Sequence, residues 1–86
     1  MKLIYCPHCH DITRLIVNRK RYCLCKQSHG MYCSDGLHAL VGGLAIPMGI
    51  SNISFAQALS RRDESGHVEK FEAFIIEKNC KTVAAG

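Results

Sequence analysis

Short runs of apolar and β-branched residues, rather than helical repeats, dominate the first half of the chain. Residues 12–17 form one such run and predict a strand, residues 18–21 are polar and predict a turn, and residues 22–25 predict a second short strand. These two strands would form a hairpin with one pair of cysteines at each open end. The pattern therefore predicts that residues 6–9 lie close to residues 23–25.

Two more short strands are predicted at 31–34 and 39–41, with a turn at Asp35-Gly36 between them. The segment 42–50 is apolar, but glycines and Pro47 interrupt it. A helix is disfavoured by these residues, so we interpret this segment as a buried loop or a bent strand.

One helix is predicted, over residues 54–62. The S-x-x-Q pattern at 54–57 matches a capping box, in which Ser54 and a glutamine satisfy backbone donors reciprocally. Arg61 and Arg62 suit the carboxyl end of the helix dipole, and residues 63–66 end the helix.

The last predicted element is a strand over 68–78 with apolar residues on both faces, which indicates a central position in a sheet. The predicted fold class is therefore α+β: an N-terminal hairpin packed on a small, mostly antiparallel sheet with one short helix. We expect a single domain over 1–86, with the metal-binding hairpin in 1–30 and the sheet and helix in 31–86.

Length and cysteine content change this picture. A domain of 86 residues buries only about 60–65% of its unfolded surface and usually needs a cross-link. The chain holds six cysteines, and no secretory leader is evident at its start. A cytoplasmic location, where cysteines bind metals rather than form disulfides, is therefore expected. The longest apolar stretch, 37–50, is too short to cross a membrane, so we expect no membrane partner.

The Cys6-Pro7-His8-Cys9 motif allows two kinds of chemistry, a redox dithiol or half of a zinc site. A redox dithiol needs a preceding buried strand and a following helix, and neither is predicted here. A second pair, Cys23 and Cys25, follows after 13 residues. Cys6, Cys9, Cys23 and Cys25 are therefore predicted to hold one structural Zn²⁺ ion. His29 and Cys33 are close enough in sequence to replace one of these four ligands.

Residues 5–30 contain a Cys-Pro-x-Cys motif, a predicted two-stranded segment and a second cysteine pair. In these features they resemble a zinc ribbon. The second pair departs from the usual pattern, because it is Cys-x-Cys rather than Cys-x2-Cys. The whole chain is also similar to small bacterial and phage proteins that carry an N-terminal ribbon. This second likeness implies no activity.

Four thiolates close the coordination sphere of zinc and leave no position for a reacting water molecule. The chain also lacks a carboxylate pair, a Ser-His-Asp set and a nucleotide-binding loop. We therefore predict no catalytic residues and a zinc-stabilised binding or adaptor protein. His8 and His10 are interpreted as exposed residues beside the metal or as donors to its sulfurs, and Cys33 and Cys80 as lone buried thiols.

Two alternative functions remain open. The net charge of +4 is concentrated in residues 1–30, although a zinc ion with four thiolates would reduce it to roughly +2. Nucleic acid is one candidate partner, bound by Arg14, Arg19, Lys20 and Arg21. A small nucleotide-like ligand is the other, bound near the helix start by Gly49, Asn52 and Ser54. The sequence identifies neither a protein partner nor an oligomeric state.

Overall fold

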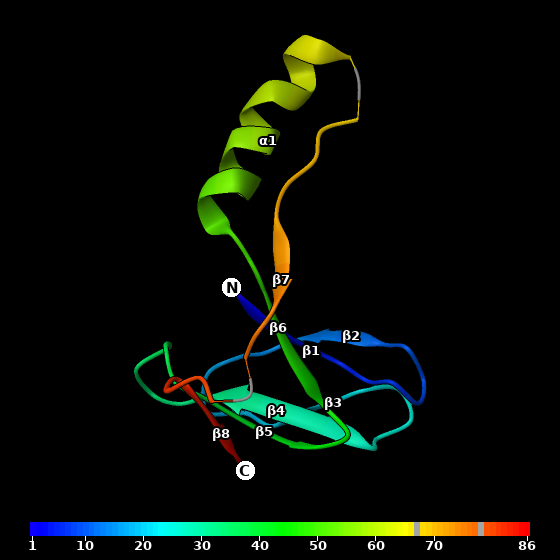
Figure 1. The fold of residues 1–86 in the computed structure, drawn as a ribbon, viewed down its shortest axis with the longest axis vertical. Coiled ribbons are helices and arrows are strands. Elements are labelled where there is room, and N and C mark those ends of the chain that lie inside the picture. Colours follow the sequence, from blue (N-terminus) through cyan, green and yellow to red (C-terminus); the bar gives the residue numbers. More distant parts are fainter. Residues whose placement is uncertain (67, 78) are drawn as a thin grey trace.

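Eight strands and one helix make up the fold (Figure 1). The computed structural model describes residues 1–66, 68–77 and 79–86, and for 63–65 the backbone alone. In chain order the elements are β1 (Lys2–Tyr5), β2 (Ile12–Arg14), β3 (Arg21–Tyr22), β4 (Ser28–Tyr32), β5 (Ala39–Gly43), β6 (Ile46–Ile50), α1 (Asn52–Ser65), β7 (Ala73–Ile75) and β8 (Val83–Ala85).

The strands form two four-stranded sheets. The first has the order β2-β1-β6-β7 and is antiparallel throughout. The second has the order β3-β4-β5-β8, in which only the β5–β8 pair is parallel. These two sheets and the single helix confirm the predicted α+β class with mostly antiparallel strands.

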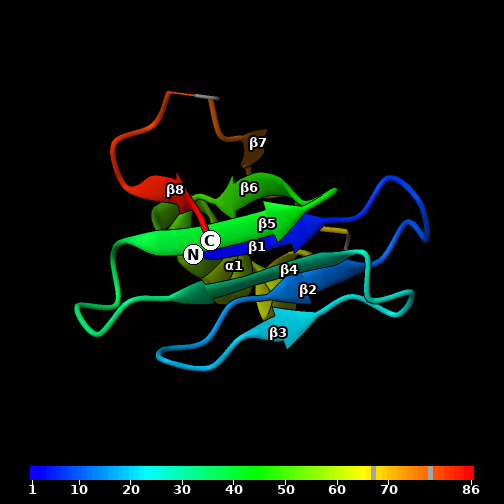
Figure 2. The ribbon, with the colours of Figure 1, turned by 90° about the horizontal axis from the view of Figure 1, so that it is seen from below.

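The predicted hairpin between 12–17 and 22–25 is wrong. β2 pairs with β1, whereas β3 pairs with β4, so the two segments belong to different sheets. Leu15 is only 2% exposed, because the chain crosses between the sheets at this point and buries its side chain there. The segment 23–25 is a turn rather than a strand. The two cysteine pairs are therefore held by separate sheets, which lie face to face in Figure 2.

A small core joins the sheets. Ile4, Leu15 and Ala39 form its buried cluster, and Tyr32 packs against it from β4. The Tyr32 hydroxyl also accepts a hydrogen bond of 2.6 Å from the backbone amide of Lys2, which links β4 to β1. So few buried side chains give little hydrophobic stabilisation, as the chain length predicts.

The strands predicted around Asp35-Gly36 are confirmed as β4 and β5, which pair with each other. The segment 42–50, for which we allowed a bent strand, contains the regular strand β6. Gly43 makes the turn before it with φ of 67°, and a Cβ at this position would lie 2.0 Å from the Gln27 carbonyl oxygen. Both the positive φ and the nearby Gln27 oxygen therefore exclude a side chain at position 43.

The predicted N-cap is wrong by three residues. Ser51 caps α1 and accepts a hydrogen bond from the Ser54 amide, and the helix ends at Gly66 in the left-handed conformation. The Ser54 hydroxyl instead accepts a hydrogen bond of 2.8 Å from the amide of Glu72. Both serines have a spacing to later residues that suits an N-cap, so the local sequence pattern alone did not show which of them caps the helix. No helix among the described residues is both long enough and apolar enough to span a membrane.

The predicted central strand over 68–78 is also wrong. Only Ala73–Ile75 is a strand, β7, and it lies at the edge of its sheet with all three residues exposed. Residues 68–72 instead run beside α1, where Phe71 meets Phe55 edge to face at 4.8 Å. The remaining position of that prediction, 78, lies outside the described residues.

Strands β1 and β8 have no counterpart among the predicted elements. The expectation that no buried strand precedes the Cys6–Cys9 motif is therefore wrong, because β1 comes directly before it with Ile4 fully buried.

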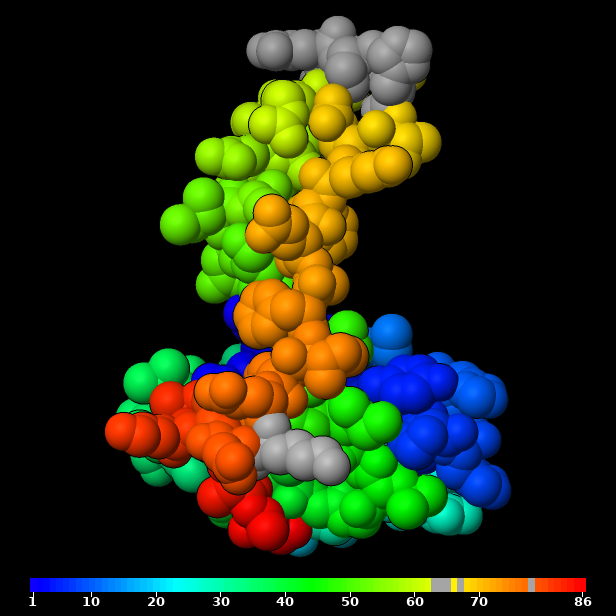
Figure 3. All heavy atoms as spheres, viewed as in Figure 1, coloured from blue at the N-terminus to red at the C-terminus, as the bar shows by residue number. Residues whose placement is uncertain are grey.

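The helix and its returning segment project from the two sheets (Figure 3). We call residues 52–66 and 68–72 the arm, and residues 1–50 the body. Within the arm, Arg61 pairs with Glu69 at 3.4 Å.

Candidate metal centre

Four cysteines meet where the two sheets come together. Their sulfur atoms all lie within 4.8 Å of one another. Cys6 and Cys9 lie in the turn after β1, and Cys23 and Cys25 lie in the turn between β3 and β4. Cys6 and Cys23 are buried, and the other two are half-buried. The structure thus brings together the four residues predicted as metal ligands.

Both cysteine turns are closed in the same way. The amide of His10 donates to the carbonyl of Cys6 at 2.8 Å, and the amide of Lys26 donates to the carbonyl of Cys23 at 3.0 Å. His10 and Lys26 both have positive φ, at 62° and 64°. The second turn closes with one residue fewer, which explains how a Cys-x-Cys pair can present two sulfurs to the same point.

The sulfur spacing matches a tetrahedral metal. Ligands at the usual zinc–sulfur distance of about 2.3 Å lie about 3.8 Å apart at the corners of a tetrahedron. Sγ of Cys25 lies 3.7 Å from Sγ of Cys6 and 3.5 Å from Sγ of Cys23. These sulfurs therefore already have the separation that a single bound ion requires.

The thiols differ in acidity. Burial raises the pKa of Cys6, but the Ser28 hydroxyl beside it and the backbone amides of its own turn outweigh this effect and lower the pKa to about 6. For Cys25, an amide hydrogen bond from Gln27 lowers the pKa, whereas burial and the three neighbouring sulfurs raise it to about 12. Four thiolates this close repel one another, so a cation is needed for all four to be ionised at neutral pH.

Ser28 is a residue of this site that the sequence interpretation missed. It begins β4, is fully buried, and its hydroxyl oxygen has no hydrogen-bond partner among the described residues. The same hydroxyl lowers the pKa of the Cys6 thiol. A buried hydroxyl of this kind is suited to donate to a metal-bound thiolate. Nothing in its sequence context separated it from an ordinary turn residue.

Asp11 is a second missed residue. Its carboxylate accepts hydrogen bonds from the Leu24 amide at 3.1 Å and from the Thr13 hydroxyl at 3.2 Å. Its own carbonyl accepts a bond of 3.0 Å from the amide of Cys6. Asp11 therefore connects the two cysteine turns and fixes their separation.

The other metal-binding candidates lie elsewhere. The ring of His10 contacts the Tyr5 hydroxyl at 2.6 Å, and the ring of His29 contacts the Gly86 carbonyl at 2.8 Å. His8 is exposed. Cys33 and Cys80 are half-buried rather than buried, and neither belongs to the cysteine cluster.

The cations suggested for nucleic acid lie along one side of the body. β2 and β3 are neighbours there, and the connection between them carries the remaining two cations (Figure 2). All of these side chains are exposed, and among the described residues none forms an ion pair: Arg14, Arg19, Lys20 and Arg21. Beside them, the Tyr22 ring packs on His29 with 5.6 Å between centroids.

The residues suggested for a small ligand have partners within the chain. Asn52 accepts a hydrogen bond of 3.0 Å from the amino group of Met1, and Ser54 binds Glu72 as described above. Gly49 lies under the ring of Phe74, which a Cβ would approach to 2.6 Å. These groups stabilise the junction between the body and the arm.

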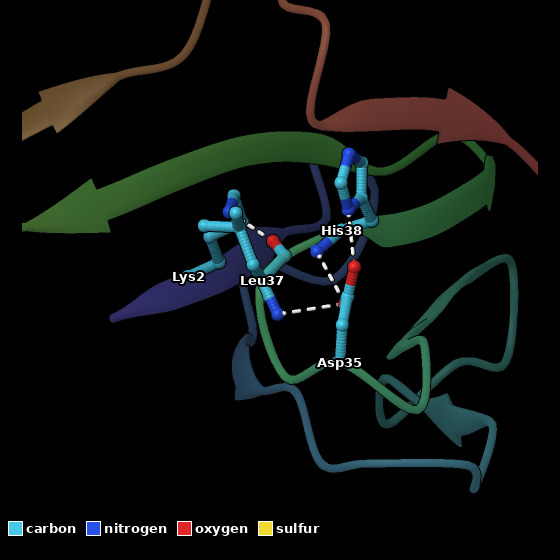
Figure 4. A network of polar contacts seen from close by, with 4 residues as sticks. All are labelled: Lys2, Asp35, Leu37 and His38. Carbon is cyan, nitrogen blue, oxygen red and sulfur yellow. Dashed lines mark hydrogen bonds and ion pairs between the residues drawn. The ribbon is translucent and has the colours of Figure 1, made fainter.

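A second polar cluster lies in the turn between β4 and β5 (Figure 4). The Asp35 carboxylate accepts hydrogen bonds from the amides of Leu37 and His38, each at 2.9 Å, and contacts the His38 ring. These bonds, led by that from Leu37, lower the pKa of Asp35 to about 2. Lys2 donates to the Leu37 carbonyl and ties this turn to β1. The cluster is exposed and orders a turn.

A comparison with known protein families, with curated proteins and with solved structures finds no match to this chain.

Proposed function

We propose that this chain is a zinc-stabilised, non-enzymatic binding or adaptor domain, in which Cys6, Cys9, Cys23 and Cys25 hold one structural Zn²⁺ ion. The observation that supports this proposal is the mutual approach of four sulfurs to within 4.8 Å, contributed by two different sheets. The ion would supply no chemistry beyond cross-linking, because four protein ligands fill its coordination sphere. The likeness of residues 5–30 to a zinc ribbon agrees with this role.

Zinc is preferred to other metals on the chemistry of the ligands. Four thiolates in tetrahedral arrangement suit zinc or iron, whereas hard cations such as Mg²⁺ and Ca²⁺ take oxygen ligands. No carboxylate among the described residues belongs to the cluster. Metal analysis of protein expressed with both zinc and iron distinguishes the two, and we expect one equivalent of zinc per chain.

The same sample tests the ligand geometry. Replacement of the bound metal by Co²⁺ should give the visible absorption and the intense thiolate charge-transfer bands of a tetrahedral four-sulfur site. Cys33→Ser should keep this spectrum, and Cys9→Ser should change it. Less than half an equivalent of metal after zinc-replete expression, or a spectrum that Cys9→Ser leaves unaltered, would disprove the proposed site.

Nucleic-acid binding is the second candidate, because four exposed cations that form no ion pair with any described residue lie beside the Tyr22–His29 ring pair. Cations contact phosphates and aromatic rings stack on bases. A variant with Arg19, Lys20 and Arg21 replaced by alanine should keep its metal but lose affinity for a random-sequence oligonucleotide. The slope of log affinity against log salt should fall by about two to three. Equal binding by the parent and the variant would reject this candidate.

A further inference from the structure

The chain exposes more surface than a compact monomer of its size. Its accessible surface is 6004 Å², whereas a folded monomer of 9.6 kDa exposes about 5,100 Å². Its radius of gyration is 14.2 Å, against about 12 Å for a compact domain of this length. The excess of roughly 900 Å² is close to the ~800 Å² that each partner buries in a standard protein interface.

The arm accounts for this extended shape (Figures 1 and 3). α1 packs along no strand of either sheet, and Ala58 is its only buried residue among those with described side chains. A helix of 14 residues is marginal in water unless one of its faces is covered. The segment 68–72 covers part of one face, through Phe71 and Glu69.

Apolar side chains remain exposed along the arm and into β7. Val68 is 90% exposed, Ile75 is 68% exposed and Phe74 is 51% exposed. The others are Ile53, Leu59 and Phe71. A cavity of about 470 Å³ opens beside β7, lined in part by Phe74 and Ile75. Large exposed apolar side chains beside a cavity are typical of an interaction site.

β7 also offers unpaired backbone groups. Glu72 accepts a bond from Ser51 and Ile76 donates to Pro47, so residues 72, 74 and 76 direct their backbone groups toward β6. Because directions alternate along a strand, the amides and carbonyls of Ala73 and Ile75 point away from the sheet. They have no hydrogen-bond partner among the described residues. This edge is open to another strand.

The charge distribution suits a second copy. Residues 51–86 carry five basic and five acidic side chains, so the entire net charge of +4 lies in residues 1–50. Two such segments can therefore approach each other without net repulsion between them. A polyanion would be attracted to the body instead.

We propose that two copies of this chain associate through β7, in antiparallel register about a two-fold axis at Phe74. This register places Ala73 opposite Ile75 of the second copy, and Ile75 opposite Ala73. All four outward backbone groups of each strand are then satisfied, and the two first sheets join into one sheet of eight strands. The interface is isologous, the commonest kind in homodimers. The pairing covers Phe74 and Ile75 and depends on neither the metal nor nucleic acid.

Molar mass in solution tests the proposal. Light scattering of the full chain at about 100 μM should give about twice the monomer mass of 9.6 kDa. Ile75→Lys places a charge in the interface, and Ala73→Pro removes an outward amide without disturbing a bond to β6. Each should raise the dimer dissociation constant by more than about tenfold. Metal content and thermal melting of each variant establish that the body is intact.

Ile12→Lys provides the matched control. Ile12 is an exposed isoleucine on β2, at the opposite edge of the same sheet. This variant should remain as dimeric as the parent. Amide exchange adds a residue-specific readout, since the amides of Ala73 and Ile75 should be protected at high concentration and exchange rapidly on dilution. A monomeric parent would overturn the proposal, as would a dimer that survives both β7 substitutions. Dimer loss in Ile12→Lys would also overturn it.

Discussion

Residues 1–50 bury Ile4, Leu15 and Ala39 between two sheets, whereas among the described side chains of the arm only that of Ala58 is buried. The body also holds four sulfurs in one cluster, and the arm has no such cluster among its described residues. Neither region has enough apolar contact to be stable alone. The comparison indicates two ways to complete a small domain: a proposed metal cross-link for the body and a proposed second copy for β7 and the arm.

Metal removal should have the largest effect of all the experiments that compare the body with the arm. A structural zinc ion contributes on the order of 10 kcal/mol to the folding of small domains, more than the core of this body can replace. A strong chelator should therefore abolish the cooperative melting transition followed by circular dichroism, and added zinc should restore it. An unchanged transition in the chelator would show that the body is stable by packing alone.

Single cysteine substitutions should distinguish ligands from other thiols. Cys25→Ser removes one of four ligands and should leave the protein unfolded or metal-free. Cys33→Ser, with a half-buried thiol outside the cluster, should lower stability by about 1–3 kcal/mol. Metal content and denaturant unfolding measure both effects. Metal retained by Cys25→Ser but lost by Cys33→Ser would contradict the ligand assignment.

Ser28→Ala should weaken the metal site without destroying it. Loss of a donor to a metal-bound sulfur typically reduces metal affinity by roughly tenfold or more. Competition with a chromophoric chelator measures this affinity. Ser60→Ala, at an exposed serine of α1, is the control and should have no effect. Equal affinities in the two variants would mean that Ser28 makes only a packing contribution.

Phe71→Ala should affect the arm and spare the body. The edge-to-face contact with Phe55 contributes about 0.5–1.5 kcal/mol beyond its apolar area. Amides of α1 should therefore exchange faster, while metal content stays constant. Val68→Ala is the matched control, because Val68 is almost fully exposed. Loss of metal in Phe71→Ala would show that the two regions are coupled more tightly than their contacts suggest.

The smallest effect is expected in the turn at Asp35. Its pKa is lowered to about 2, so the stability it contributes is complete above the ordinary carboxyl pKa and is lost as the pH falls toward 2. At pH 7, Asp35→Ala should lower the melting temperature slightly, and Asp35→Asn should do so less because its amide oxygen still accepts hydrogen bonds. Equal effects of Asp35→Asn and Asp35→Ala would indicate that the ion pair with His38 dominates.

The sequence predicted the cysteine cluster better than the strand pairing. Cysteine spacing is a local property, and it identified all four clustered residues. Strand partners depend on long-range contacts, so the segments 12–17 and 22–25 were assigned to one hairpin although Leu15 is buried between two sheets. The apolar run at 68–76 was placed in the centre of a sheet for a similar reason. This segment is rich in apolar residues, but among the described residues their side chains are largely exposed.

Ser28 and Asp11 could not be identified from local patterns, because their roles depend on the approach of two distant turns. Likewise, the cations at 14–21 and the residues at 49–54 were identified by residue type. Within the described part of the chain, the first group forms no ion pairs, and Asn52 and Ser54 in the second group have hydrogen-bond partners. Whether either group contacts a ligand stays a prediction for the binding experiments.

The position of the cysteines along the chain also bears on biosynthesis. All four lie within the first 25 residues, and the serine beside them is residue 28. The complete set of proposed ligands therefore emerges from the ribosome before β5, β6 and the arm emerge. Metal binding would then precede the pairing of β1 with β6. The elements synthesised last would pack against a nascent chain in which the metal already joins the two cysteine pairs.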